Sequence, residues 1–136
     1  MPDRYVFDAF ALNALRLDEP GAAQVQNILD DLSSEVYMSA INLGELLDTL
    51  RRRRGQEAAQ TMESAAFQQP NLTVVEASWA RIRAAAEIKA DGGLSYADAF
   101  AAALAREMSA PLVTGDPELE RLEQRGLIQV VWLPRR

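Results

Sequence analysis

Short apolar runs alternate with helical patterns along the chain, and this alternation restricts the folds open to it. Five runs have the length and composition of strands: residues 4–7, 36–40, 72–75, 111–114 and 128–133. Helical spacing or helix-capping residues mark seven other segments: 9–17, 22–33, 42–54, 56–68, 78–90, 96–108 and 117–124. Strands that alternate with helices favour a parallel sheet with helices on its faces. We therefore predict an α/β fold with a central, mainly parallel sheet of about five strands.

The size of the chain fits one compact domain, over residues 1–136. Hydrophobic residues make up 49% of it, which is enough to fill a core on both faces of such a sheet. No apolar run approaches the roughly 20 residues that a membrane helix requires, and the N-terminus leads directly into a strand pattern. We expect a soluble, cytoplasmic protein.

The sequence contains no cysteine and no histidine, which excludes several kinds of chemistry. Disulfides, thiolate metal sites and thiol catalysis are excluded, and the usual general base is missing. Any metal must be bound by oxygen, which favours Mg²⁺ or Mn²⁺. The net charge of −6 argues against a general nucleic-acid binder. It does not exclude a nuclease, because bound divalent ions would place positive charge where a phosphate must enter.

Four acidic residues lie where predicted strands give way to predicted helices. Asp8 and Asp116 follow strands 4–7 and 111–114, whereas Glu45 and Asp98 lie in the first turn of a helix. The carboxyl ends of parallel strands meet at one edge of a sheet, so the four carboxylates should converge there. Such a cluster is costly unless cations neutralise it. Two divalent ions and metal-assisted phosphodiester hydrolysis would account for it.

The same four acids also have a structural explanation. Asp8 and Asp116 can be helix N-caps, and two capping boxes can be drawn, Asn42 with Glu45 and Ser95 with Asp98. The recurrence of one pattern at four junctions favours a shared site. Spacing alone nevertheless leaves both interpretations open, and a carboxylate can serve both, since a helix N-terminus keeps it ionised.

Three blocks of sequence carry a resemblance to a known family. The first is Val6-Phe7-Asp8, and the second is the run from Ser39 to Leu47 around Glu45. The third and most specific is the helix 94–105 around Asp98, followed by Pro111-Leu112-Val113-Thr114-Gly115-Asp116. With these blocks the chain resembles the PIN-domain ribonucleases, most closely the VapC-type toxins of bacterial toxin–antitoxin pairs. The resemblance covers essentially the whole chain.

The resemblance implies a function and a set of partners. Asp8, Glu45, Asp98 and Asp116 would hold one or two Mg²⁺ or Mn²⁺ ions, which activate a water for the hydrolysis of RNA. The substrate would be RNA, with no side-chain nucleophile. Members of this family are often homodimers and are silenced by a small antitoxin protein that crosses the site. Both a homodimer and an antitoxin partner are therefore expected.

The chain departs from the family pattern directly after the first acid. The family often has a pair of hydroxyl side chains there, whereas this chain has Ala9 and Phe10. The departure keeps an alternative open, a PIN-fold interaction module with weak or no catalysis that binds a protein partner. An extra acid also often follows the last motif. Glu118 is the nearest candidate here and ranks below the other four.

Three further features carry weaker predictions. The basic run Arg51–Arg54 is either a solvated helix end or a patch that contacts phosphate. Trp79 and Trp132 have apolar neighbours in the sequence and are predicted to pack in the core or in an interface. Thr114 either orients Asp116 or a water, or is an ordinary hydroxyl at a strand end.

Overall fold

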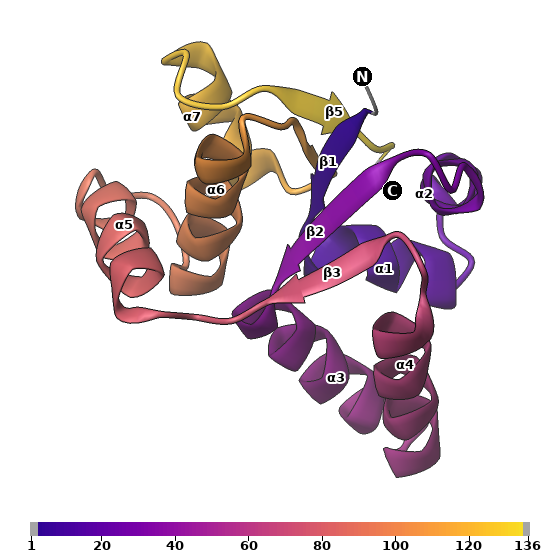
Figure 1. Ribbon diagram of the computed structural model, residues 1–136. Helices are drawn as coiled ribbons and strands as arrows, with labels where there is room; N and C mark the ends of the chain where they lie inside the picture. Colours follow the sequence, from indigo (N-terminus) through magenta and orange to yellow (C-terminus); the bar gives the residue numbers. More distant parts are fainter. Residues whose placement is uncertain (1–2, 135–136) are drawn as a thin grey trace.

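A five-stranded sheet forms the centre of the protein in the computed structural model, which describes residues 3–134 (Figure 1). All neighbouring strands are parallel, in the order β3-β2-β1-β4-β5. The strands are β1 (Arg4–Phe7), β2 (Glu35–Ser39), β3 (Leu72–Val75), β4 (Leu112–Thr114) and β5 (Val130–Trp132). The predicted α/β class and each of the five predicted strands are confirmed.

Helices connect the strands and cover both faces of the sheet. They are α1 (Ala9–Arg16), α2 (Ala22–Asp30), α3 (Ala40–Arg54), α4 (Gln56–Gln68), α5 (Trp79–Ala90), α6 (Tyr96–Met108) and α7 (Glu120–Gln124), with the 3₁₀ turn η1 (Pro117–Leu119) before α7. Within residues 3–134, no helix is long and apolar enough to cross a membrane.

Alternation along the strands divides the core into two layers. Phe7 and Met38 point to the face that is covered by α1, α2, α3 and α4. Val6 and Leu112 point to the opposite face, which is covered by α6 and by the segment around α7. Figure 1 shows the resulting arrangement, with α3 and α4 on one side of the sheet and α5 and α6 on the other. Strands that are buried on both faces explain why the apolar runs in the sequence are nearly continuous.

The strand order reverses between β1 and β4. After β1 the chain crosses to the face of α1, and after β4 it crosses to the opposite face, where Leu119 and Leu122 pack. Connections that leave adjacent strands toward opposite faces create a crevice outside the carboxyl ends of those strands. Asp8 and Asp116 follow these two strands, so the topology places both at the crevice.

The start of α3 differs from the prediction. Ser39 caps this helix, since its Oγ accepts a hydrogen bond of 3.2 Å from the N–H of Ile41. The helix therefore begins at Ala40, and Glu45 lies in its second turn and not in its first. The capping box predicted for Asn42 is wrong, because Asn42 is inside the helix and only 1% exposed.

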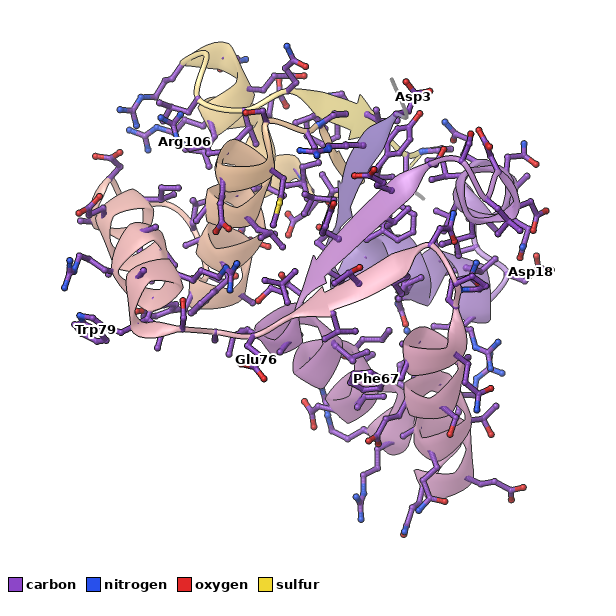
Figure 2. The ribbon with its side chains drawn as sticks, viewed as in Figure 1. Asp3, Asp18, Phe67, Glu76, Trp79 and Arg106 are labelled. Atoms are coloured by element: carbon purple, nitrogen blue, oxygen red, sulfur yellow. The ribbon has the colours of Figure 1, made fainter. Side chains whose placement is uncertain are left out.

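The two tryptophans lie in different surroundings. Trp132 packs against the core layer of α6, as predicted. A core position for Trp79 is wrong: its side chain is 66% exposed at the start of α5 (Figure 2). The Arg83 guanidinium lies 5.7 Å from the centre of the Trp79 ring, within the range of a cation–π contact.

Candidate metal centre

Asp8 is buried at the end of β1, where its carboxylate has two hydrogen-bond donors. Oδ1 accepts from the N–H of Ala11 at 3.1 Å, which caps α1. Oδ2 accepts from the hydroxyl of Thr114 at 2.5 Å, 106 positions away in the sequence. The N-cap interpretation of Asp8 is therefore confirmed. The same carboxylate also faces a residue of the neighbouring strand.

Thr114 connects the two strands that flank the crevice. Its side chain is fully buried; Oγ1 donates to Asp8 and accepts a 3.0 Å hydrogen bond from the N–H of Asp116. Asp116 in turn caps the 3₁₀ turn, where Oδ1 accepts from the N–H of Glu118 at 3.0 Å. Of the two interpretations of Thr114, the structure supports the one in which it orients the acids.

Asp98 reaches the crevice from the first turn of α6, on the face of the sheet opposite to α1. Ser95 caps this helix, as predicted, by accepting from the N–H of Asp98 at 3.1 Å. Carboxylate oxygens of Asp98, Asp116 and Glu118 lie within 4.8 Å of one another. Glu118, the lowest-ranked acid in the sequence, thus belongs to the tightest group. Its signal was the Asp116-Pro117-Glu118 turn, which brings two acids onto one side of a short 3₁₀ turn.

Burial and neighbouring charge raise the pKa values of the two buried acids. The pKa of Asp98 rises to about 8, first because of burial, then because of a hydrogen bond with the Glu118 carboxyl and the charge of Asp116. Burial also raises the pKa of Asp8 to about 7, against the hydrogen bonds from Thr114 and Ala11, which lower it. Both acids would therefore hold a proton for part of the neutral range unless a cation replaced it.

Glu45 lies on the solvent-exposed rim of the crevice, on α3. Its pKa is raised by partial desolvation and by the charges of Asp116 and Asp48. Asp116 raises the pKa values of Asp8, Asp98 and Glu45 alike. Asp116 is thus the common neighbour of the other three predicted acids, and the four lie close enough for their charges to interact.

The donor set suits a hard divalent cation. Carboxylates surround the crevice, and the sequence offers no thiolate or imidazole. Four ion pairs are formed within residues 3–134, namely Arg4–Glu35, Arg52–Asp48, Arg81–Glu107 and Arg125–Asp91, and none includes an acid of the crevice. No ion pair therefore neutralises the cluster, and a hard divalent cation fits both its donor atoms and its electrostatics.

Phe10, at one of the two positions where the sequence departs from the pattern it resembles, lies against the loop after β4. A Cβ atom placed on Gly115 would lie 2.5 Å from two carbons of the Phe10 ring, so the ring lies directly against the backbone between Thr114 and Asp116. Ala9 is partly buried beside it. Neither position offers a polar atom to the crevice, and Thr114 supplies the hydroxyl that contacts Asp8.

Comparison with protein families identifies the class to which this fold and acidic crevice belong. The PIN domain family matches residues 5–124, which include all four predicted acids and Glu118. The chain belongs to the PIN domain family. No curated protein sequence matches it.

Several solved structures with the same fold are described as toxins or as toxin–antitoxin complexes. VapC20 of Mycobacterium tuberculosis, described as a sarcin–ricin loop cleaving toxin, aligns with a TM-score of 0.72 at 20% identity over 86% of this chain and 93% of its own. VapBC2 of Rickettsia felis, bound to a fragment of its promoter DNA, gives 0.71 at 14% identity, over 96% and 99% of the two chains. FitAcB of Neisseria gonorrhoeae gives 0.65 at 18% identity, over 93% and 95%. At these identities the similarity establishes the fold.

Proposed function

We propose that this protein is a metal-dependent endoribonuclease that acts as the toxin of a toxin–antitoxin pair. The observation that carries the proposal is the convergence of Asp8, Glu45, Asp98 and Asp116 at the point where the strand order reverses. Membership of the PIN family supports the same class of chemistry. The structural similarity to VapC20 and to VapBC complexes supports the toxin role.

Each acid has a defined part in this proposal. Asp8, Asp98 and Asp116 would hold one or two Mg²⁺ or Mn²⁺ ions from the floor of the crevice, and Glu45 would complete the set from its rim. Such ions supply a water of lowered pKa and stabilise the charge that develops on the scissile phosphate. Thr114 holds Asp8 and the backbone of Asp116 in register. Glu118 contributes a fifth carboxylate near Asp98.

The proposed partners follow from the same class. RNA is the substrate, and a small antitoxin covers the acidic crevice, where a basic side chain would find unneutralised carboxylates. A homodimer in the cytoplasm is the expected form. The alternative is a PIN-fold module that binds a protein partner with weak or no catalysis. Ala9 and Phe10 favour that alternative, whereas four intact acids oppose it.

RNA cleavage by partner-free protein tests the nuclease. Purified protein is incubated with total RNA in Mn²⁺ or in excess EDTA, and the cut ends are mapped. We expect cleavage that requires the metal and is lost in Asp98→Asn, since a lost metal ligand removes several kcal/mol of transition-state stabilisation. Asp30→Asn, an exposed acid of α2, is the matched control and should cleave normally. Equal cleavage in EDTA would refute the mechanism.

Expression in a bacterial host tests the toxin role independently of the nuclease activity. The wild-type chain should arrest growth, and co-expression of the neighbouring open reading frame should restore growth and copurify with the chain. Asp98→Asn should not arrest growth. If the wild-type chain is harmless and no neighbouring product binds it, the toxin role fails, although the nuclease can still stand on its RNA assay.

A further inference from the structure

Asn42 joins the helix that carries Glu45 to the helix that carries Asp98. It lies in the first turn of α3 and is 1% exposed, and its Nδ2 donates to the backbone carbonyl of Ala97 in α6 at 3.0 Å. The two residues are 55 positions apart. This hydrogen bond therefore fixes the position of one helix relative to the other at the crevice, where both begin.

The carbonyl that Asn42 holds belongs to the peptide unit directly before Asp98. The N–H of the same unit donates to Ser95 Oγ at 3.1 Å. A peptide unit is planar and rigid, so a hydrogen bond at each end fixes the backbone from which the Asp98 side chain projects. Glu45 follows Asn42 by three residues and lies next to it on the surface of α3. Asn42 thus contacts the residue directly before Asp98 and lies one helical turn before Glu45.

The Asn42 amide is retained at a cost in stability. Its Oδ1 is buried and has no hydrogen-bond partner among residues 3–134. A buried acceptor without a partner is destabilising, and an apolar side chain of similar volume avoids that loss. The neighbouring buried positions of α3 are in fact leucines, Leu43 and Leu46. A polar side chain at this position therefore indicates a role that packing alone does not require.

We propose that Asn42 is a positioning residue of the metal centre, which fixes the helix of Glu45 and the backbone of Asp98 relative to each other at the crevice. The inference rests on the proposed metal site and adds a residue to it that does not itself contact the ion. Loss of a group that orients metal ligands typically weakens metal affinity by about 10–100-fold. Asn42 orients two of them, through the backbone of one and the helix of the other.

Calorimetric titration with Mn²⁺ tests the inference in the wild type, Asn42→Leu and Asn13→Leu. Asn13 is the matched control, since it is the other asparagine with a buried, unpartnered Oδ1, and its Nδ2 faces Glu19 in the loop after α1. Asn42→Leu should bind Mn²⁺ at least about tenfold more weakly. Its metal-free melting temperature should change little, because removal of the unpartnered oxygen offsets the loss of the hydrogen bond to Ala97. Asn13→Leu should bind Mn²⁺ as the wild type does.

A second measurement, made on the wild type, tests the inference even if Asn42→Leu fails to fold. In the wild type, Mg²⁺ should shift the side-chain amide NMR signals of Asn42 and leave those of Asn13 in place. Equal Mn²⁺ affinities for wild type and Asn42→Leu would overturn the inference. So would an Asn42 amide signal that does not shift when Mg²⁺ is added. Neither result would contradict the proposed nuclease activity. Wild type whose Mn²⁺ affinity depends on Asn42 but that cuts no RNA would refute the nuclease and keep the inference. Wild type that binds no Mn²⁺ would refute both.

Discussion

Thr114 has a position in the crevice that few side chains could fill. One hydroxyl donates to the carboxylate of Asp8 and accepts from the N–H of Asp116, inside a fully buried environment. A hydroxyl can do both at once because it carries one donor and two acceptor lone pairs. Thr114 therefore sets the spacing of the acids after β1 and β4, and it lowers the pKa of Asp8 against the effect of burial.

Replacing Thr114 with valine should test this link. Thr114→Val keeps the shape but leaves the Asp116 N–H without its partner and removes the donor to Asp8. We expect a loss of about 1–3 kcal/mol in the free energy of unfolding, measured with urea in metal-free protein. Thr114→Ser retains the hydroxyl and serves as the control, with a smaller loss that reflects one buried methyl group. Equal losses in both variants would show that the methyl group matters and the hydrogen bonds do not.

Helix α1 packs against the end of β4 through an aromatic ring and a glycine. The Phe10 ring occupies the space in which a side chain on Gly115 would begin, and the Leu133 carbonyl lies 3.2 Å from the same point. Position 115 therefore requires glycine because the Phe10 ring approaches its backbone closely, and not because of an unusual backbone angle. The contact holds the first turn of α1, which Asp8 caps, against the loop that carries Asp116.

Gly115→Ala should consequently destabilise the protein. We expect a loss of about 1–3 kcal/mol, the usual cost of overpacking a filled site, measured by urea unfolding. The loss should be smaller when Gly115→Ala is introduced into Phe10→Leu, because the shorter side chain leaves room for the added methyl group. A double-mutant cycle measures this coupling. If the two changes were additive, the ring would not be what excludes a side chain at this position.

The order of elements could be predicted from the sequence because its signals are local. Apolar runs and the serine cap at Ser95 mark the boundaries of elements to within a few residues. The start of α3 could not be predicted in this way, since Ser39 and Asn42 are both acceptable caps. The choice depends on the contact of Asn42 with Ala97, 55 positions later, which only the folded chain provides.

The candidate site could likewise be predicted only in part. The positions of Asp8, Asp98 and Asp116 at the crevice could be predicted because strand ends and helix starts are visible in the sequence. The roles of Thr114 and Glu118 depend on which carboxylates lie opposite them, and strand order decides that. The core option for Trp79 was wrong because apolar neighbours in the sequence do not indicate which side of α5 faces the core. The buried side is formed by Ala85.

The acids of the crevice oppose folding when no metal is bound. Asp8 and Asp98 have pKa values of about 7 and about 8 in the folded protein, above the ordinary aspartate value of 3.8. The folded state then binds more protons than the unfolded state between these limits. Stability from these groups is therefore complete below about pH 4 and is lost as pH rises through about 7 to 8.

A pH series of thermal melts should show this loss. In EDTA the melting temperature should fall between pH 6 and pH 8.5, by roughly 5 °C or more for a chain of this size. Saturating Mn²⁺ should remove the fall, since a bound cation replaces the protons. The double variant Asp8→Asn/Asp98→Asn should have a flatter profile in EDTA. An identical slope in wild type and variant would mean that other groups control the pH dependence.

Charge removal separates a shared metal site from scattered helix caps. Asparagine caps a helix about as well as aspartate, so Asp8→Asn and Asp116→Asn should keep hydrogen bonds to Ala11 and Glu118. Each change removes one charge from a cluster in which Asp116 raises the pKa values of three neighbours. In EDTA at low salt the variants should therefore melt at the wild-type temperature or above it.

In Mn²⁺ the order of the melting temperatures should reverse, so that the wild type melts above the asparagine variants. Binding to the folded state raises its melting temperature in proportion to the logarithm of the metal concentration over Kd, so variants that lack a ligand should gain less than the wild type. Asp30→Asn, on exposed α2, should gain as much as the wild type does. The expected pattern is equal or greater stability without metal and a smaller gain with it, in the same protein. Caps alone cannot produce both effects, since the asparagine variants retain them, and equal Mn²⁺ gains in all four proteins would contradict a shared site.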